Sequence, residues 1–521
     1  MLLHEFLEES ARKYPNKVAL VQKEERWTYR AIDEKANQVA HALRNQGIQR
    51  GDRVAIFLDN SVESVVSLFG ILKADAVFLM LSSLLKPAKL GYILNNCRVK
   101  MMISEDRKLN AASDVFPSIP SLKSVISVGS QSAISSSSEV HFQILPWSEI
   151  DALPPDSRHK PPTRNIDLDL ATVIYTSGST GNPKGVMLTH LNMISAATSI
   201  TTYLRNVPED IILSCLPLSF DYGLYQVLMA FKFGGTIILE KSFTYPYDVI
   251  KKMVKEKVTG FPGVPTIFAI LLQMKDLKNF DLQSLRYITN TAAALPVSHI
   301  RQIREAFPQA ILYSMYGLTE CKRVSYLPPE ELDRRPDSVG RGMPNEEVWI
   351  TDEQGHRAGP GVVGELVVRG SNVMRGYWED PETTDRVLKP GPLPGEKVLY
   401  TGDLFRMDEE GFLYFVGRKD DMIKTRGERV SPKEVENSIH SMEGVAEAAV
   451  IPVADDILGQ AIKAFIVLKQ GYALGEKDLL LHCKRTLEEF AIPKYFELRE
   501  SLPKNASGKI DKLSLRQEGN R

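Results

Sequence analysis

The segment from Tyr175 to His190, YTSGSTGNPKGVMLTH, concentrates residue types that could bind an anion. It contains three glycines, two clusters of hydroxyl side chains and one lysine, placed between an apolar run and an amphipathic run. Glycines can adopt positive φ, so that consecutive backbone N–H groups converge and form a concave anion site. The same residue types are also common in turns, and by composition a polar hairpin turn fits as well as a polyphosphate loop.

The residues that flank this loop predict how it is held. The run DLATVIY before it alternates apolar and β-branched residues and predicts a strand, whereas LNMISAATSITTYL after it predicts a helix. The expected arrangement is therefore strand, loop, helix. The glycine spacing of GxxxxGK[ST] is absent, which excludes a Walker loop.

Four further segments carry polar residues that are ordinary when each is taken alone. They are YGLTE at 316–320, YTGDL at 400–404, GRKDDMIKTRGERVSPKEVE from 417 and PKNASGKID at 503–511. In isolation Glu320 fits a solvated surface acid, Asp403 a turn carboxylate after a glycine, and Lys509 a solvated turn lysine. The order of all five segments along the chain carries more information than any one of them.

Together the five segments resemble, residue for residue and in the same order, the motifs of the adenylate-forming superfamily. That superfamily includes acyl-CoA synthetases, aryl-CoA ligases, peptide-synthetase adenylation domains and firefly-type luciferases, and this chain is most similar to bacterial AMP-forming acyl-CoA ligases. The resemblance implies that ATP and a carboxylic acid give acyl-AMP and pyrophosphate, after which a thiol captures the acyl group. It implies ATP, Mg²⁺ and CoA, or a phosphopantetheine carrier, as cofactors.

The resemblance also implies roles for residues around the nucleotide. Tyr316 is expected to stack on adenine, Thr319 to bind the α-phosphate and Glu320 to hold Mg²⁺, which prefers hard oxygen ligands. Asp403 should accept from the ribose hydroxyls, with Arg418 in support. The loop around the β- and γ-phosphates would comprise Thr176, Ser177, Gly178, Ser179, Thr180, Gly181 and Lys184.

Three residues of the last segments take roles that only the resemblance implies. Lys509 would reach the reaction centre and bridge the acid's carboxylate and the α-phosphate, which makes it, with Thr319 and Glu320, a candidate catalytic residue. Asp420 matches the hinge about which a small C-terminal domain swings. Gly427 matches the position past which the pantetheine thiol approaches.

The acyl pocket is expected to include Phe220, Asp221, Gly263 and Ala292. Many CoA ligases have a histidine in place of Phe220, whereas amino-acid-activating domains commonly have phenylalanine followed by aspartate. Asp221 could therefore neutralise a substrate ammonium, because a buried carboxylate needs a partner. The alternative, which we favour slightly, is an Asp that caps the following helix or binds local backbone N–H groups.

The alternation of short apolar runs with helical patterns predicts an α/β fold. We expect a large N-terminal domain of layered sheets with flanking helices at 1–417, which binds ATP and the acyl group. A small mobile α+β lid domain at 418–521 would carry Lys509. In the second domain Ser431 and Pro432 predict a helix start, 445–453 and 462–469 predict strands, and 476–490 predicts a helix.

Composition narrows the class of partner. Lys plus Arg number 64 and Asp plus Glu 65, so no general attraction to nucleic acid or anionic membrane is expected. The longest apolar stretch, 65–85, is interrupted by Lys73 and Asp75, which favours a buried helix and strand over a membrane span. The four cysteines show no metal-ligand spacing and the N-terminus lacks a signal-peptide pattern, so we expect reduced thiols and a cytoplasmic enzyme.

The sequence leaves three functions to compare. The first is an ATP-dependent ligase that makes acyl-CoA from a small-molecule acid. The second is a stand-alone amino-acid adenylating enzyme that loads a separate carrier protein. The third is a catalytically idle nucleotide-binding scaffold, which the intact Lys509, Glu320 and Asp403 disfavour.

Overall fold

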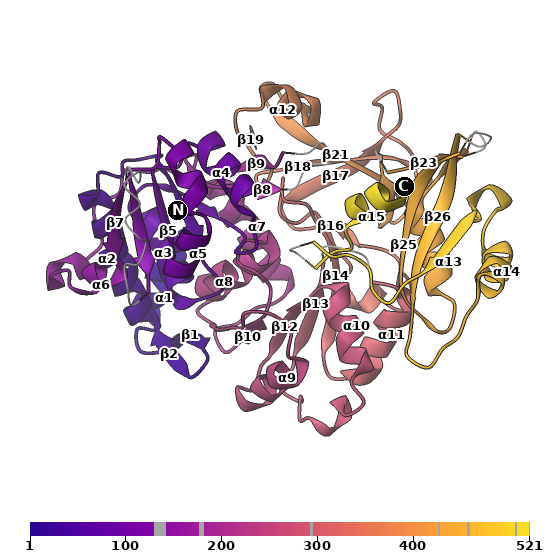
Figure 1. The fold of residues 1–521 in the computed structure, drawn as a ribbon, viewed down its shortest axis with the longest axis horizontal. Coiled ribbons are helices and arrows are strands. Elements are labelled where there is room, and N and C mark those ends of the chain that lie inside the picture. Colours follow the sequence, from indigo (N-terminus) through magenta and orange to yellow (C-terminus); the bar gives the residue numbers. More distant parts are fainter. Residues whose placement is uncertain are drawn as a thin grey trace.

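The computed structural model describes residues 1–129, 142–176, 182–291, 295–419, 421–425, 428–455, 459–505 and 508–519. Within these residues the chain forms four β-sheets with helices packed on them, which confirms the predicted α/β class. In Figure 1 the indigo N-terminal part lies at one end of the molecule and the yellow C-terminal sheet at the other, with the magenta and orange parts between them.

The first large sheet of the described chain has eight strands and is parallel except at one edge. All four residues of its strand VFLM are buried, as expected for a strand covered by helices on both faces. In spatial order the strands are β19 (Gly376–Tyr377), β9 (Lys184–Thr189), β8 (Leu170–Thr176), β4 (Val77–Met80), β3 (Arg53–Phe57), β5 (Met101–Glu105), β6 (Ser124–Val128) and β7 (Gln143–Pro146).

The antiparallel edge of this sheet corrects one expectation. The segment after the phosphate loop forms strand β9, paired antiparallel with β8 so that Thr176 faces Lys184, and only then does the helix at 190–203 begin. The arrangement is therefore strand, loop, strand, helix. The run KGVMLT is short and contains glycine and lysine, and its strand character depends on pairing with β8, a contact that residue periodicity does not report.

The second large sheet has nine strands in the described chain, and its strand β14 ends at the motif residue Tyr316. In spatial order the strands are β16 (Arg341–Gly342), β15 (Ser325–Tyr326), β14 (Ile311–Tyr316), β13 (Tyr287–Asn290), β12 (Gly260–Gly263), β10 (Ile211–Ser214), β11 (Thr236–Leu239), β1 (Val18–Gln22) and β2 (Glu25–Thr28).

A third sheet joins the large sheets to the C-terminal part. Its strands are β17 (Glu346–Thr351), β18 (Gly364–Gly370), β21 (Lys397–Met407), β20 (Leu388–Pro390) and β22 (Leu413–Arg418). The antiparallel pairing of β21 with β22 sets Asp403 directly opposite Arg418. Strand pairing therefore brings two of the expected nucleotide residues together.

The fourth sheet consists of β24 (Glu428–Val430), β23 (Ile423–Thr425), β26 (Gly459–Leu468), β25 (Val445–Asp455) and β27 (Tyr495–Leu498). Two hydrophobic clusters that contain only residues from Ile423 onward pack around it. Ser431 caps the helix at 432–440 by accepting from the backbone N–H of Glu434, as expected. The helix expected at 476–490 ends at Thr486, because Leu487 is extended.

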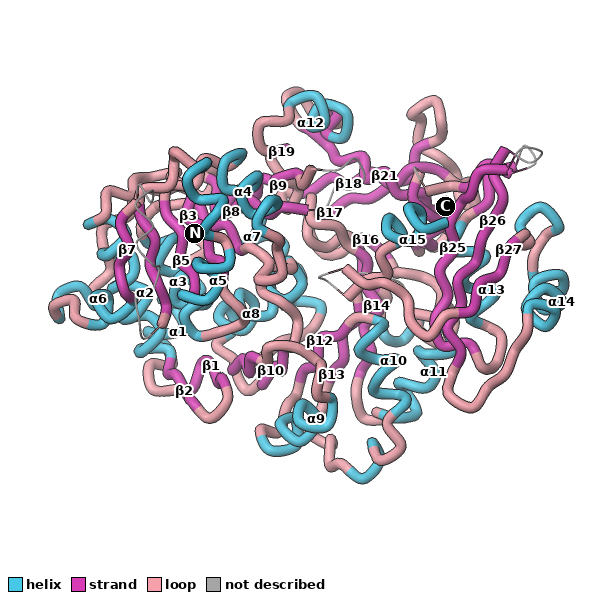
Figure 2. The backbone as a smooth tube through the Cα atoms, in the orientation of Figure 1, coloured by secondary structure: helices cyan, strands magenta, loops and turns pink. Residues whose placement is uncertain are grey.

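The helices cover the sheets and link their strands (Figures 1 and 2). The stretch expected to be a buried helix and strand forms α3 and β4, and no helix in the described ranges is long and apolar enough to cross a membrane. The helices are α1 (Glu5–Lys13), α2 (Tyr29–Asn45), α3 (Val62–Lys73), α4 (Pro87–Asn96), α5 (Asp106–Ala111), α6 (Trp147–Asp151), α7 (His190–Tyr203), α8 (Asp221–Phe233), α9 (Pro246–Lys255), α10 (Pro265–Gln273), α11 (Val297–Ala306), α12 (Pro381–Val387), α13 (Pro432–His440), α14 (Glu476–Thr486) and α15 (Lys512–Gly519).

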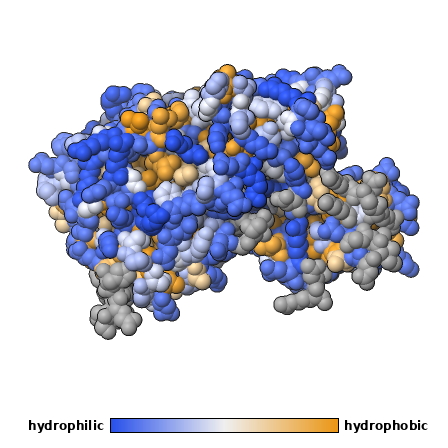
Figure 3. Space-filling model, turned by 90° about the horizontal axis from the view of Figure 1, so that it is seen from above, coloured by the Kyte–Doolittle hydropathy of each residue, from blue (hydrophilic) through white to orange (hydrophobic). Residues whose placement is uncertain are grey.

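The surface is mainly hydrophilic on the face seen in Figure 3, with apolar residues in small groups. All four cysteines are buried and unpaired, in agreement with the expectation of reduced thiols. No group of three or more His, Cys, Asp or Glu side chains suited to a metal ion occurs in the described part of the chain.

Position 340, next to strand β16, requires glycine because of its backbone conformation and because there is no room for a side chain. Its φ is +87°, and a Cβ there would lie 1.8 Å from the carbonyl oxygen of Tyr326. Gly355 has a similar φ of +86° but open space around its Cβ position. We expect Gly340→Ala to lower the melting temperature well beyond Gly355→Ala, which should cost only the left-handed strain of about 1–3 kcal/mol. Thermal unfolding of both variants tests this, and equal shifts would contradict it.

Candidate active site

Three strands bring Tyr316, Asp403 and Arg418 together. Tyr316 is the last residue of β14, Arg418 is the last residue of β22, and Asp403 lies within β21. The Tyr316 hydroxyl donates a hydrogen bond of 2.5 Å to Asp403 Oδ2, and Arg418 Nε lies 3.4 Å from Oδ1 of the same carboxylate. The Tyr316 ring packs edge-on against Phe405, at 4.9 Å between centroids. Burial raises the pKa of Asp403, and Arg418 and Tyr316 oppose that rise by stabilising the carboxylate.

Glu320 and Lys184 are connected through Tyr377 in strand β19. The Tyr377 hydroxyl donates to Glu320 Oε1 at 2.7 Å, and Lys184 Nζ lies 5.6 Å from the centre of the Tyr377 ring. Lys184 also donates to the hydroxyl of Thr383 at 3.2 Å and lies 3.9 Å from Asp380. Tyr377 was not among the residues expected from the sequence, yet it joins the end of the phosphate loop to YGLTE.

The phosphate loop itself is described only at its two ends. Thr176 closes strand β8 and Lys184 opens strand β9, so the hairpin fixes both ends of the loop. The expected anion-binding residues Ser177, Gly178, Ser179, Thr180 and Gly181 lie outside the described residues, as do Ala292, Asp420 and Gly427.

Lys509 enters the same region from the C-terminal part of the chain. Its loop is held by Asn505, whose side chain accepts from the Lys509 backbone N–H at 3.0 Å. The Gly508 carbonyl accepts from the hydroxyl of Thr266, in α10, at 3.0 Å. Figure 2 shows this loop, between β27 and α15, crossing toward β14 and α10. The hydrogen bond therefore ties the lysine loop to the N-terminal part.

The surroundings of Lys509 are acidic and aromatic. Its ammonium lies 5.9 Å from the centre of the Phe220 ring. Burial lowers the pKa of Lys509, while the carboxylates of Asp221, Asp403 and Glu320 raise it. The structure thus brings the expected catalytic lysine to the expected ribose, metal and acyl-pocket residues, although these lie more than 100 positions away in the sequence.

Asp221 has a cationic partner within the chain that neither of its two expected interpretations included. It is the first residue of α8 and is buried, and Lys322 Nζ lies 3.5 Å from its Oδ2. Asp221 therefore has a cationic partner within the chain, so that it is not solely a cap on local backbone. Burial lowers the pKa of Lys322 to about 7, and Asp221 opposes that fall.

Two other expected pocket residues have clear local contacts. Phe220 precedes α8 and packs edge-on against Tyr222 at 6.3 Å between centroids. Gly263 ends strand β12, and a Cβ on it would lie 2.5 Å from Phe268. The close approach of that ring alone accounts for the glycine, whether or not substrate also contacts it.

Sequence reasoning did not single out Thr266, Lys322 and Arg323. The signal for the last two was present, because two consecutive cations lie between the apolar residues Cys321 and Val324 just after YGLTE. They are nevertheless 4% and 1% exposed. Charged residues are almost never so buried without a partner, so burial marks them as unusual.

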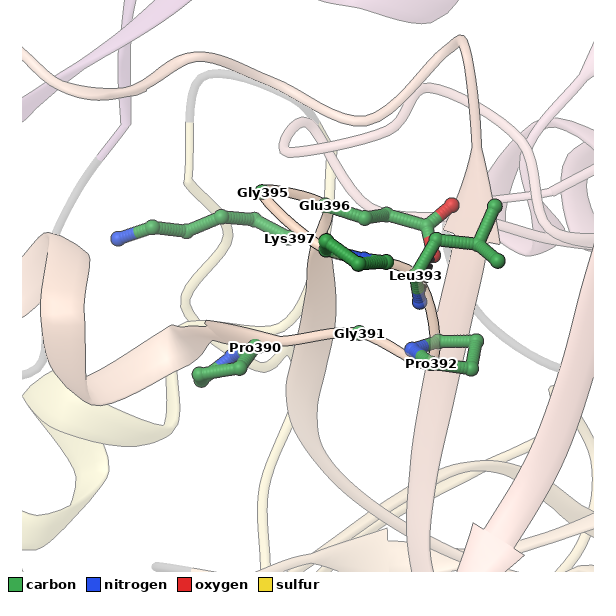
Figure 4. Close-up of a pocket in the computed structure, with 8 residues that line it drawn as sticks. Pro390, Gly391, Pro392, Leu393, Gly395, Glu396 and Lys397 are labelled. Carbon is green, nitrogen blue, oxygen red and sulfur yellow. Dashed lines mark hydrogen bonds between the residues drawn. The ribbon is translucent and has the colours of Figure 1, made fainter.

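The lining of the pocket drawn in Figure 4 does not include these residues. It is lined by the single loop 390–397, and none of the motif residues contributes to it. Its charged side chains are already paired, Glu396 with Arg369 at 2.7 Å and Lys397 with Asp385 at 3.1 Å. This pocket contains no free group for the chemistry that the motifs predict.

Comparison with known proteins agrees with the geometry. Residues 7–378 match the family described as AMP-binding enzyme, and residues 434–509 match the AMP-binding enzyme C-terminal domain. The chain is 32% identical to a long-chain-fatty-acid–CoA ligase of Bacillus subtilis (strain 168), over 99% of this chain and 94% of that protein. It is 30% identical to tyrocidine synthase 3 of Brevibacillus parabrevis, over 98% of this chain and 8% of that protein.

Solved structures show the same overall arrangement. The anthranilate CoA ligase AuaEII in complex with anthranoyl-AMP superimposes with a TM-score of 0.89 at 27% identity, covering 100% of this chain and 97% of that one. ATP-bound MatB from Rhodopseudomonas palustris superimposes with a TM-score of 0.87 at 27% identity, covering 99% of each chain. The match to the family model over most of the chain, with the motifs gathered at one centre, shows that this protein belongs to the AMP-binding family of adenylate-forming enzymes.

Proposed function

We propose that this enzyme, an acid–thiol ligase of the acyl-CoA synthetase type, joins a carboxylic acid to CoA through an acyl-adenylate at the centre around Lys509. A carboxylate oxygen of the acid attacks the α-phosphorus of ATP, and the bond to pyrophosphate breaks. The CoA sulfur then attacks the acyl carbon, the thiol proton is released, and AMP leaves with the carboxylate oxygen. The observation that supports this site is the convergence of Lys509, Asp403, Glu320 and Asp221.

The residues around Asp403 would bind the nucleoside. The buried Asp403 carboxylate has two oxygens that can accept from a cis diol, and Arg418 across the strand pair orients it. Tyr316, fixed by its bond to Asp403 and its packing on Phe405, offers a ring for adenine. Thr319 would donate to the α-phosphate from the turn that follows β14.

The triphosphate would lie between the β8–β9 loop and YGLTE. Thr176, Lys184 and the loop residues 177–181 provide backbone and side-chain donors for the β- and γ-phosphates. The Glu320 carboxylate is a hard oxygen ligand, oriented by Tyr377, and the described residues offer no cluster of further protein ligands beside it. That fits Mg²⁺, which is commonly held by one or two carboxylates together with substrate phosphates, and which would neutralise charge on the triphosphate.

Lys509 would act on the first half-reaction. The reacting carboxylate and the α-phosphate are both anionic, and a cation between them lowers the barrier most where negative charge accumulates. We propose that the C-terminal domain, from about residue 418, turns about Asp420 after adenylation and presents the segment around Gly427 to the thiol. The acceptor thiol is that of CoA or of a separate phosphopantetheine carrier protein, and the reducing cytoplasm suits the buried free cysteines.

Two observations bear on the class of acid: the names of similar proteins and the charged partner of Asp221. The similar curated ligases are named for long-chain fatty acids, and the similar peptide synthetases make amino acids the second candidate. Lys322 pairs with Asp221 at 3.5 Å, which weakens the case for an amino-acid ammonium at that carboxylate. A pyrophosphate-release screen over fatty, aromatic, dicarboxylic and amino acids, with and without CoA, tests the function. ATP binding with no acid-dependent pyrophosphate release would leave the idle scaffold as the better description.

Lys509→Ala should remove adenylate formation and spare the thioester step. We expect a fall of about 10²- to 10³-fold in acid-dependent pyrophosphate release, the usual cost of losing one preorganised charge-stabilising donor. Acyl-CoA formation from supplied acyl-AMP should change much less. Lys504→Ala, in the same loop but paired with Glu447, is the matched control. Equal loss of both steps in Lys509→Ala would contradict the assignment.

Thr266→Val should weaken the placement of Lys509 without removing it. The lost hydrogen bond to Gly508 is expected to slow adenylation about two- to tenfold, in line with the net worth of one such bond. Thioester formation from supplied acyl-AMP should stay near the wild-type rate. Thr198→Val, an exposed helical threonine bonded only to its own helix, serves as control. A defect confined to the thioester step would refute this role.

Asp403 should make nucleotide binding sensitive to low pH. Because burial raises the pKa of Asp403, its carboxylate is protonated at a higher pH than an exposed aspartate, and ribose acceptance is lost as pH falls. The KM for ATP should therefore rise as pH is lowered. Asp403→Asn should raise that KM about tenfold or more at neutral pH and flatten its pH dependence. An unchanged pH profile in the variant would show that another group is responsible.

A further inference from the structure

The short segment 374–378 joins the YGLTE motif to the hairpin that holds the phosphate loop. At its start the backbone N–H of Met374 donates to the carbonyl of Glu320 at 2.8 Å, and at its end the N–H of Trp378 donates to the carbonyl of Gly185 at 2.7 Å. Between these two bonds, strand β19 pairs antiparallel with β9 (Figure 1). The backbone of this segment is therefore fixed to both motifs.

The side chain of Tyr377, in the middle of the segment, contacts one charged group of each motif. Tyr377 is buried, and its backbone N–H donates to the hydroxyl of Thr384, in α12, at 2.9 Å. Its hydroxyl donates to Glu320 Oε1 at 2.7 Å, and its ring centre lies 5.6 Å from Lys184 Nζ. One tyrosine thus orders a carboxylate and an ammonium that are distant in the sequence.

The two contacts leave both charged groups able to bind a ligand. The hydrogen bond engages Oε1 of Glu320, and the second oxygen, Oε2, accepts from no described residue. Lys184 is 26% exposed at its side chain, and its other contacts are the Thr383 hydroxyl at 3.2 Å and Asp380 at 3.9 Å. The tyrosine therefore restricts the motion of these two side chains without covering them.

Resting on the function proposed above, we propose that Tyr377 is a positioning residue for the metal and the triphosphate. Its hydroxyl would orient Glu320 toward Mg²⁺, and its ring would hold Lys184 near the β- and γ-phosphates. A side chain that is already ordered loses less conformational entropy when it binds a ligand. Hydrogen-bond partners of metal-binding carboxylates commonly change metal affinity about 10- to 100-fold when they are removed.

The test measures ATP binding with and without the metal. Calorimetry gives the dissociation constant of ATP in excess EDTA and at a series of free Mg²⁺ concentrations. Tyr377→Phe loses the hydroxyl, so the free Mg²⁺ concentration that gives half of the full increase in ATP affinity should rise about 10- to 100-fold. The dissociation constant in EDTA should stay within about twofold of the wild-type value, because the ring still faces Lys184.

Tyr377→Leu tests the contribution of the ring. This variant lacks the hydroxyl and the aromatic face, so in EDTA it should bind ATP about two- to fivefold more weakly than Tyr377→Phe does. AMP lacks the phosphates that Lys184 would contact, and it should bind both variants equally. In a Glu320→Gln background, Tyr377→Phe should not change the Mg²⁺ dependence further, since the charged group that the hydroxyl orients is gone.

Tyr414→Phe is the matched control. It also removes a hydroxyl that donates to a carboxylate, that of Asp408 at 3.1 Å, and it keeps a ring that faces a cation, Arg406. This variant should bind ATP as the wild-type enzyme does, with and without Mg²⁺. A general loss of structure in the Tyr377 variants would appear as a lower melting temperature and as weaker binding of AMP.

An unchanged Mg²⁺ dependence in Tyr377→Phe, or equal weakening of ATP binding with and without Mg²⁺, would overturn the inference. Equal affinity of Tyr377→Phe and Tyr377→Leu for ATP in EDTA would overturn the part assigned to the ring. The ligase function is tested separately. A wild-type enzyme that binds Mg-ATP but releases no pyrophosphate with any acid would refute that function, and the binding measurements would still decide the role of Tyr377.

Discussion

The site depends on placing one cation between groups that repel each other. An acid and a triphosphate are both anionic, and they react only where positive charge separates them in a region partly closed to water. In the proposed reaction Lys509 supplies that charge from a loop of the C-terminal part, and the Thr266–Gly508 hydrogen bond holds this loop against the N-terminal part. The carboxylates around Lys509 oppose the fall in its pKa that burial causes.

Charge pairing also involves the expected acyl-pocket residue Asp221. Its carboxylate lies 3.5 Å from Lys322 and also raises the pKa of Lys509, so one carboxylate interacts with two cations. Arg323 is left with nitrogens that no described residue accepts from. Burial lowers the pKa of Lys322 to about 7, so this cation is only partly charged at neutral pH and its balance with Asp221 depends on pH.

The β8–β9 hairpin illustrates where sequence reasoning failed. DLATVIY was correctly expected as a strand, since alternation and β-branched residues act locally. KGVMLT lacks such a pattern and becomes a strand because β8 and β19 pair with it on both sides. For the phosphate loop the consequence is mechanical: two paired strands fix its ends more closely than a strand and a helix joined in series would.

The sequence by itself determined the family and the α/β class, and it predicted the nucleotide motifs and the role of Lys509, because each motif is a short contiguous run and the motifs occur in a recognisable order along the chain. Only the tertiary structure decided which side chains from distant segments share one place. Tyr377 beside Glu320, Thr266 beside Gly508 and Lys322 beside Asp221 all come from segments more than 50 residues apart. Burial and charge pairing depend on such long-range contacts, and no local pattern encodes them.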